Sequence, residues 1–98
     1  MKARQDGNIL QPTALTLSSY PNPFNPTTTV SYAVLEETHV RIAVFNYIGI
    51  QVAELVEATV PVGTHDVVWN ADNLPSGTYF VRLITESTQI QKSVQLIK

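Results

Sequence analysis

Apolar and polar residues alternate with a period of two along most of the chain, in short runs. In residues 28–34, for example, Val30, Tyr32 and Val34 fall on one side. Such alternation is typical of a strand with one buried face. Similar runs cover residues 39–47, 50–56, 64–69, 78–85 and 90–97, and a seventh begins with Leu15 and Leu17. Seven strands at a spacing of about 8–12 residues predict an all-β fold, a seven-stranded antiparallel immunoglobulin-like β-sandwich.

Turn signals separate the runs at residues 21–26, 61–63 and 70–77. Gly49 can take a positive φ, so it predicts a tight hairpin between two strands. Residues 53–59 are the only helical candidate. They are short and contain β-branched residues, so we interpret them as strand plus loop.

The length of 98 residues fits one domain, which we place at residues 14–98. Residues 1–13 are polar apart from Ile9 and Leu10 and show no period, so we expect a flexible tail or linker there. They lack the basic-then-apolar plan of a signal peptide. If the domain is exported, we therefore expect the signal peptide elsewhere in a larger parent chain.

Composition excludes several classes of function. Six Lys and Arg residues against eight Asp and Glu residues give a formal net charge of −2, and no basic stripe is present. Binding of nucleic acid therefore has no electrostatic basis. The chain has no cysteine, which excludes disulfides, thiol nucleophiles and zinc sites of the Cys type. Its apolar runs are too short for a membrane-spanning helix.

The polar residues do not form a catalytic or metal-binding pattern. No tight spacing links the two histidines, His39 and His65. Glu36 and Glu37 are adjacent, so their carboxylates point apart and cannot flank one substrate bond. Residues 70–73 carry oxygen ligands but lack the spacing of a calcium loop. An Asx-type turn is expected there, with calcium as the minor alternative. We therefore predict no enzyme, no metal and no cofactor.

Aromatic residues offer the other candidates for binding. Trp69 is the sole tryptophan, and we expect it in the core, with a carbohydrate-stacking platform as the alternative. If Val40 faces the core, alternate residues of its strand face outward, and the same parity applies to the run over residues 78–85. These two strands are neighbours in an immunoglobulin-type sandwich. One outer face then carries a candidate interface patch, unless a loop covers it: Arg41, Phe45, Tyr47, Phe80, Arg82 and Ile84.

Two motifs carry a resemblance to a known family. Tyr20-Pro-Asn-Pro-Phe-Asn-Pro26 and Leu74-Pro-Ser-Gly-Thr-Tyr79 resemble segments of the C-terminal sorting domain of the type IX (Por) secretion system, type A. The similarity covers about residues 14–98 and also extends to the immunoglobulin-like domain of flagellar hook-capping proteins. Ile50 stands where the family often has a basic residue. The family signature comprises Pro21, Asn22, Pro23, Phe24, Asn25, Pro26, Gly49, Gly63, Trp69, Leu74, Pro75, Gly77 and Tyr79.

The proline motif also has a physical interpretation. Pro23 and Pro26 fix φ and favour extended conformations at Asn22 and Asn25. We expect a stiff corner that Phe24 pins to the core. Pro21 and Pro23 have no amide donor, so they should also hinder another strand from pairing with this edge. Structure alone explains these motifs, so they need not contact a receptor.

The resemblance implies a secretion and cell-surface sorting signal at the end of a larger exported protein. Such a domain passes through the periplasm and is recognised folded by the outer-membrane type IX machinery, and the parent ends at the cell surface or outside the cell. A sortase-like protease commonly cleaves upstream of the sandwich, here within or near residues 1–16. Its partners are this machinery and an N-terminal passenger domain, and self-association stays open. The candidate recognition strand contains Lys92, Val94, Leu96, Ile97 and Lys98.

Two other classes remain as alternatives. One is a structural spacer or hook-capping-type assembly domain, and the other is a carbohydrate-binding module.

Overall fold

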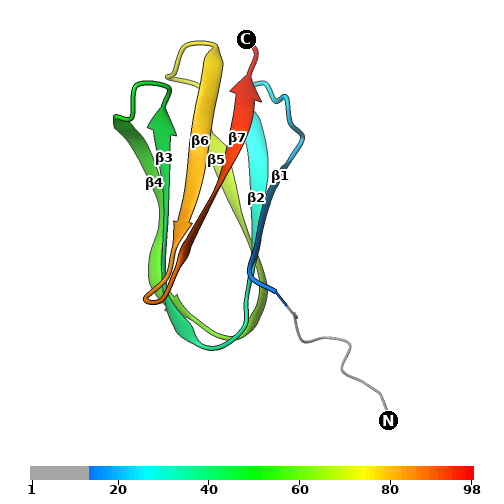
Figure 1. Cartoon of the computed structure of the whole chain (residues 1–98). Coiled ribbons are helices and arrows are strands. Elements are labelled where there is room, and N and C mark those ends of the chain that lie inside the picture. The colour runs from blue at the N-terminus through cyan, green and yellow to red at the C-terminus, as the bar shows by residue number, and fades with distance from the viewer. Residues whose placement is uncertain (1–13) are drawn as a thin grey trace.

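Seven antiparallel strands form two packed sheets in the computed structural model (Figure 1), which describes residues 14–98. The all-β prediction is confirmed. The expected tail at residues 1–13, and with it most of the expected cleavage region, lies outside the described residues. The strands are β1 (Thr16–Tyr20), β2 (Thr27–Val34), β3 (Thr38–Asn46), β4 (Gln51–Val60), β5 (Gly63–Asn70), β6 (Gly77–Ile84) and β7 (Gln89–Leu96).

The two sheets have the strand orders β1-β2-β5 and β4-β3-β6-β7. β3 and β6 are neighbours, as the interface prediction required. In a constant-type immunoglobulin domain the fourth strand lies in the sheet of the first, second and fifth. Here it pairs with β3 from Thr38↔Val60 to Phe45↔Gln51. The short hairpin between β3 and β4 keeps these strands side by side, since antiparallel neighbours need only a tight turn.

The alternation in the sequence decides which side chains form the core. Val30, Tyr32 and Val34 of β2 are all buried, and so are Val81 and Leu83 of β6. The remaining members of the core cluster are Leu17, Phe24, Val40, Ile42, Val44, Val60, Trp69, Ala71, Tyr79, Val94 and Leu96. Both sheets contribute, so the core lies between them, as the period of two predicts.

The predicted hairpin is present between β3 and β4. Asn46 N donates to Ile50 O at 2.9 Å, and the side-chain Oδ1 of Asn46 accepts from the N–H groups of Ile48 and Ile50 at 3.1 and 3.0 Å. Gly49 has φ of +92°. Residues with a Cβ rarely adopt this backbone conformation, so the turn requires glycine or a residue that tolerates positive φ.

The interpretation of residues 53–59 as strand plus loop is wrong in its second half. β4 continues to Val60 without a loop. Register shifts between Ile42 and Ala43 and between Val44 and Phe45 mark bulges, after which the pairing with β3 continues. Pairing with β3 therefore decides the length of β4, because the backbone groups of β4 find hydrogen-bond partners along β3.

The chain crosses the sandwich so that β1 begins at one end and Lys98 lies at the other (Figure 1). We call the end with Lys98 the signature end, because the loops at residues 20–27 and 70–77 lie there with the hairpin at residues 46–51. Within residues 14–98 there is no helix long and apolar enough to span a membrane.

Gly49→Ala should lower the free energy of unfolding by about 1 kcal/mol, because alanine pays for the positive φ with steric strain. Gly49→Asn should cost less, since asparagine tolerates this region of φ. Chemical denaturation of both variants measures the difference. Equal stability of the alanine variant and the wild type would contradict the geometry of the turn.

Candidate functional site

The first signature motif lies along the last strand. Phe24 forms a parallel bridge with Leu96. Its N–H donates to Gln95 O at 2.9 Å, and its carbonyl accepts from Ile97 N at 2.9 Å. One residue of the motif thus binds the outer edge of β7 as a strand would.

The side chain of Asn22 extends this pairing by a further step. Its Oδ1 accepts from Gln95 N at 3.0 Å, and its Nδ2 donates to Ser93 O at 3.3 Å. A carboxamide offers the same donor and acceptor as a peptide group, so it can replace a backbone unit at a strand edge. Asn22 and Phe24 together therefore cover the edge of β7 from Ser93 to Ile97.

An aromatic cluster anchors the motif to the core. Phe24 is 3% exposed, and its ring centroid lies 5.1 Å from that of Trp69. Trp69 in turn meets Tyr79 edge-on at 6.0 Å. Such pairs add stability beyond their buried area. The expectation that Phe24 pins the corner is confirmed. Trp69 is itself 3% exposed, so it fills the core and cannot serve as the carbohydrate platform.

The second signature motif holds the end of the chain. Tyr79 Oη donates to Pro75 O at 2.6 Å, and burial raises the pKa of this phenol. Lys98 Nζ donates to the carbonyls of Asp72 and Leu74 at 2.6 and 3.1 Å, and Lys98 N donates to Ser76 Oγ at 2.9 Å. Both motifs and the last strand therefore meet at the signature end.

The candidate recognition strand divides into two sets of side chains. Val94 and Leu96 are 1% exposed and belong to the core, so they cannot contact a receptor while the domain is folded. Lys92, Ile97 and Lys98 are exposed, Ile97 at 55%. Only these three of the five candidates are accessible.

The candidate interface patch lies on the outer face of the four-stranded sheet, with five of its six residues on β3 and β6. Phe45 stands opposite Phe80 in the register, and Arg41 opposite Ile84. The Arg82 guanidinium lies 4.3 Å from the centroid of the Phe45 ring and also donates to Gln91 Oε1. Both phenylalanines are half-buried, because neighbouring side chains cover part of each ring. Tyr47 is 78% exposed and lies at the tip of the hairpin beyond β3.

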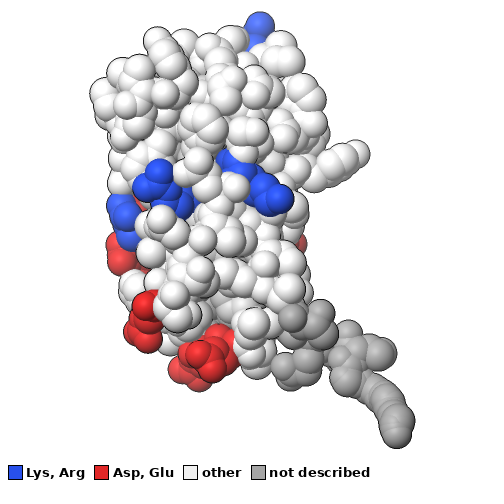
Figure 2. Space-filling model, in the orientation of Figure 1, with Lys and Arg blue, Asp and Glu red and all other residues white. Residues whose placement is uncertain are grey.

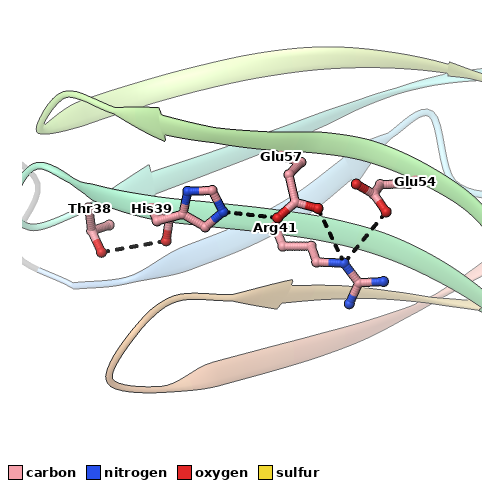
Figure 3. A network of polar contacts seen from close by, with 5 residues as sticks. All are labelled: Thr38, His39, Arg41, Glu54 and Glu57. Atoms are coloured by element: carbon pink, nitrogen blue, oxygen red, sulfur yellow. Dashed lines mark hydrogen bonds and ion pairs between the residues drawn. The ribbon is translucent and has the colours of Figure 1, made fainter.

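A polar network crosses the same face nearer the opposite end (Figure 3). His39 Nε2 lies 2.9 Å from Glu57 Oε2, and Arg41 Nε lies 3.5 Å from Glu54 and 3.8 Å from Glu57. The hydrogen bond with His39 is the main cause that lowers the pKa of the Glu57 carboxyl. All these side chains are partly or largely exposed, so the network stabilises the fold weakly.

The remaining polar candidates have structural partners. His65 Nε2 lies 2.8 Å from Pro61 O, and its ring packs on Tyr32. Asn70 Oδ1 accepts from Asp72 N at 2.9 Å, which confirms the Asx-type turn. Among residues 14–98, no group of three or more His, Asp and Glu side chains is placed to hold a metal ion.

The comparisons define the class of this domain. The family model for the secretion system C-terminal sorting domain matches residues 18–98, and comparison with curated proteins gives no match. The chain belongs to this family of C-terminal sorting domains, which the type IX system uses. It is a sorting signal for the secretion of a larger protein, and its family is not a catalytic one.

The contact of the Asn22 amide with β7 is the feature of the candidate site that sequence reasoning missed. Its motif was identified and an extended backbone was expected at Asn22, but no partner was expected for its side chain. The partner atoms lie 71 and 73 residues away, so no local pattern could indicate them.

Phe24→Ala should lower the free energy of unfolding by about 3–5 kcal/mol, because it leaves a cavity beside Trp69. Tyr20→Ala is a matched control, since Tyr20 is 82% exposed and close in sequence. It should change stability by less than about 0.5 kcal/mol. Thermal and chemical denaturation measure both. A mild effect at Phe24 would show that this ring does not anchor the motif.

The carboxyl of Glu57 should titrate below its ordinary pKa of 4.5, and His39→Ala should move that pKa back toward the ordinary value. Because the folded-state pKa is lowered, the ionised carboxyl contributes to stability at pH values above its ordinary pKa. This contribution is lost as the pH falls through the folded-state pKa. NMR titration of the Glu57 side chain measures the shift in both proteins. An unchanged pKa in the His39 variant would contradict the assigned cause.

Proposed function

We propose that the outer-membrane machinery recognises this domain in its folded state, at the signature end of the sandwich. The observation that carries the proposal is the meeting of both family motifs with the last strand at this end. Asn22, Phe24 and Lys98 hold that arrangement by hydrogen bonds that exist only after folding. A receptor that reads this end therefore distinguishes a folded domain from an unfolded one.

The surface of the signature end supports this role. Exposed apolar side chains gather in its loops and at the end of the chain: Tyr20, Tyr47, Ile48, Ile50 and Ile97. Asp72 is the only acidic residue in the loops over residues 20–27, 46–51 and 70–77. Exposed apolar groups with few charges are typical of a protein-binding surface.

The opposite end differs in its charge. Glu36, Glu37 and Glu86 lie in the loops that join β2 to β3 and β6 to β7. Figure 2 shows acidic side chains gathered toward that end and basic ones across the middle of the same face. Such a surface is well solvated, which suits the side of the domain next to a passenger.

The direction of β1 supports the place of the passenger and of cleavage. β1 begins at the end opposite to the signature end, where Glu36, Glu37 and Glu86 lie. A passenger joined on the N-terminal side of β1 therefore leaves the signature end accessible (Figure 1). A protease needs an extended, unpaired segment, and of the described residues Ala14 and Leu15 come before the first strand. We therefore place cleavage within or near residues 1–16, after transit of the parent through the periplasm.

Ile97→Asp in the parent protein should reduce its display at the cell surface by about tenfold and leave it in the periplasm. A charge at a contact that excludes water costs well over 1 kcal/mol. Leu35→Asp is the matched control, since Leu35 is 51% exposed but lies at the other end. Cell fractionation and surface labelling measure display.

Deletion of residues 95–98 should block display as well. It also removes the buried Leu96, so the folding of the deleted chain must be measured alongside. Normal display of a folded Ile97→Asp parent would refute recognition at this end. An equal loss of display in Leu35→Asp would show that recognition is not confined to the signature end.

A further inference from the structure

A groove separates β1 from the first half of β7. It has a volume of about 400 Å³ and is lined by Leu15, Thr16, Leu17, Ile90, Gln91 and Lys92. β1 and β7 are edge strands of different sheets and do not pair with each other. β1 therefore approaches β7 across the groove without pairing, and this edge of β7 forms no ladder with another strand within residues 14–98.

The outer edge of β7 changes along its length. Asn22 and Phe24 bind Ser93 O, Gln95 N, Gln95 O and Ile97 N on this side. Alternate residues of an antiparallel strand point their N–H and C=O groups to the same side. The pairing of β6 with β7 runs from Gly77↔Leu96 to Ile84↔Gln89 without a register shift. The N–H and C=O of Gln91 and the N–H of Ser93 therefore also point outward, but beyond the reach of Asn22.

We propose that this groove binds an extended segment of the secretion receptor, which adds as a strand to the edge of β7 at residues 89–93. The inference rests on the proposed function for the identity of the partner and specifies how part of the recognition is made. Main-chain hydrogen bonds to Gln91 and Ser93 supply affinity, as in other cases of strand addition. The same pairing cannot extend to Ile97, because Phe24 already occupies that part of the edge.

The side chains of the groove define the chemistry of the segment. Leu15 and Ile90 are half-buried and offer an apolar floor, which fits an aliphatic side chain of the incoming strand. Lys92 is exposed on the wall of the groove and fits a carboxylate. A lysine on an edge strand also discourages unspecific strand pairing. The groove therefore favours an acidic-aliphatic segment over a second apolar edge.

Gln91→Pro tests the backbone contact, with Gln91→Ala as the matched control. Both variants lose the side chain that binds Arg82, but only proline also removes the outward N–H. Proline is tolerated on an edge strand where the N–H does not serve the ladder. In a parent protein with the whole chain at its end, display of Gln91→Pro should fall about three- to tenfold below that of Gln91→Ala.

Lys92→Glu and Lys92→Gln form a second pair that leaves the backbone intact. The glutamate variant should be displayed about three- to tenfold less than the glutamine variant, because it repels the carboxylate of the segment. Circular dichroism and thermal melting report whether each variant folds. If Gln91→Pro does not fold, the Lys92 pair decides alone.

Equal display within each pair of folded variants would overturn the proposal. If the wild type is displayed and Ile97→Asp is not, the proposed function stands even when the groove variants behave as their controls. Sedimentation of the purified chain checks for a different occupant. A wild-type dimer that is lost in Gln91→Pro would assign the groove to a second copy and likewise overturn the proposal.

Discussion

The burial of Phe24 against Trp69 is the interaction on which the signature end depends. It draws the segment between β1 and β2 over the core, next to the last strand. The backbone of Phe24 then meets Gln95 and Ile97, and the amide of Asn22 reaches β7. An apolar contact thus determines where several hydrogen bonds form, because packing supplies the driving force and the polar groups must then find partners.

Covering one half of an edge strand and leaving the other half open resolves two opposing demands. An open edge endangers a domain that must stay unaggregated during export, and Asn22 and Phe24 close it from Ser93 to Ile97. A domain that is recognised as a signal must still present something to bind. The groove beside residues 90–92 and the exposed apolar loops offer such surfaces, and in the proposed strand addition Lys92 limits which segment the edge accepts.

Much of the fold followed from local pattern. The period of two identified the buried faces of β2, β3 and β6, and Gly49 identified the hairpin. The prediction was wrong for residues 53–59, because their length and composition do not decide between strand and loop. Pairing with β3 decided it, across two bulges. The hairpin after β3 likewise decides which of the two sheets β4 joins, and the number of strands does not decide it.

The sequence by itself determined the number of strands, their inner and outer faces, the lack of thiol chemistry and the membership of the family. These properties depend on residue type and short-range spacing, which any stretch of chain carries with it. Only the tertiary structure decided that Val94 and Leu96 are unavailable to a receptor, that Asn22 replaces a strand, and that a groove lies beside Lys92. The contacts of Asn22 and the two walls of the groove join residues more than 70 positions apart, which only the packing of the two sheets brings together.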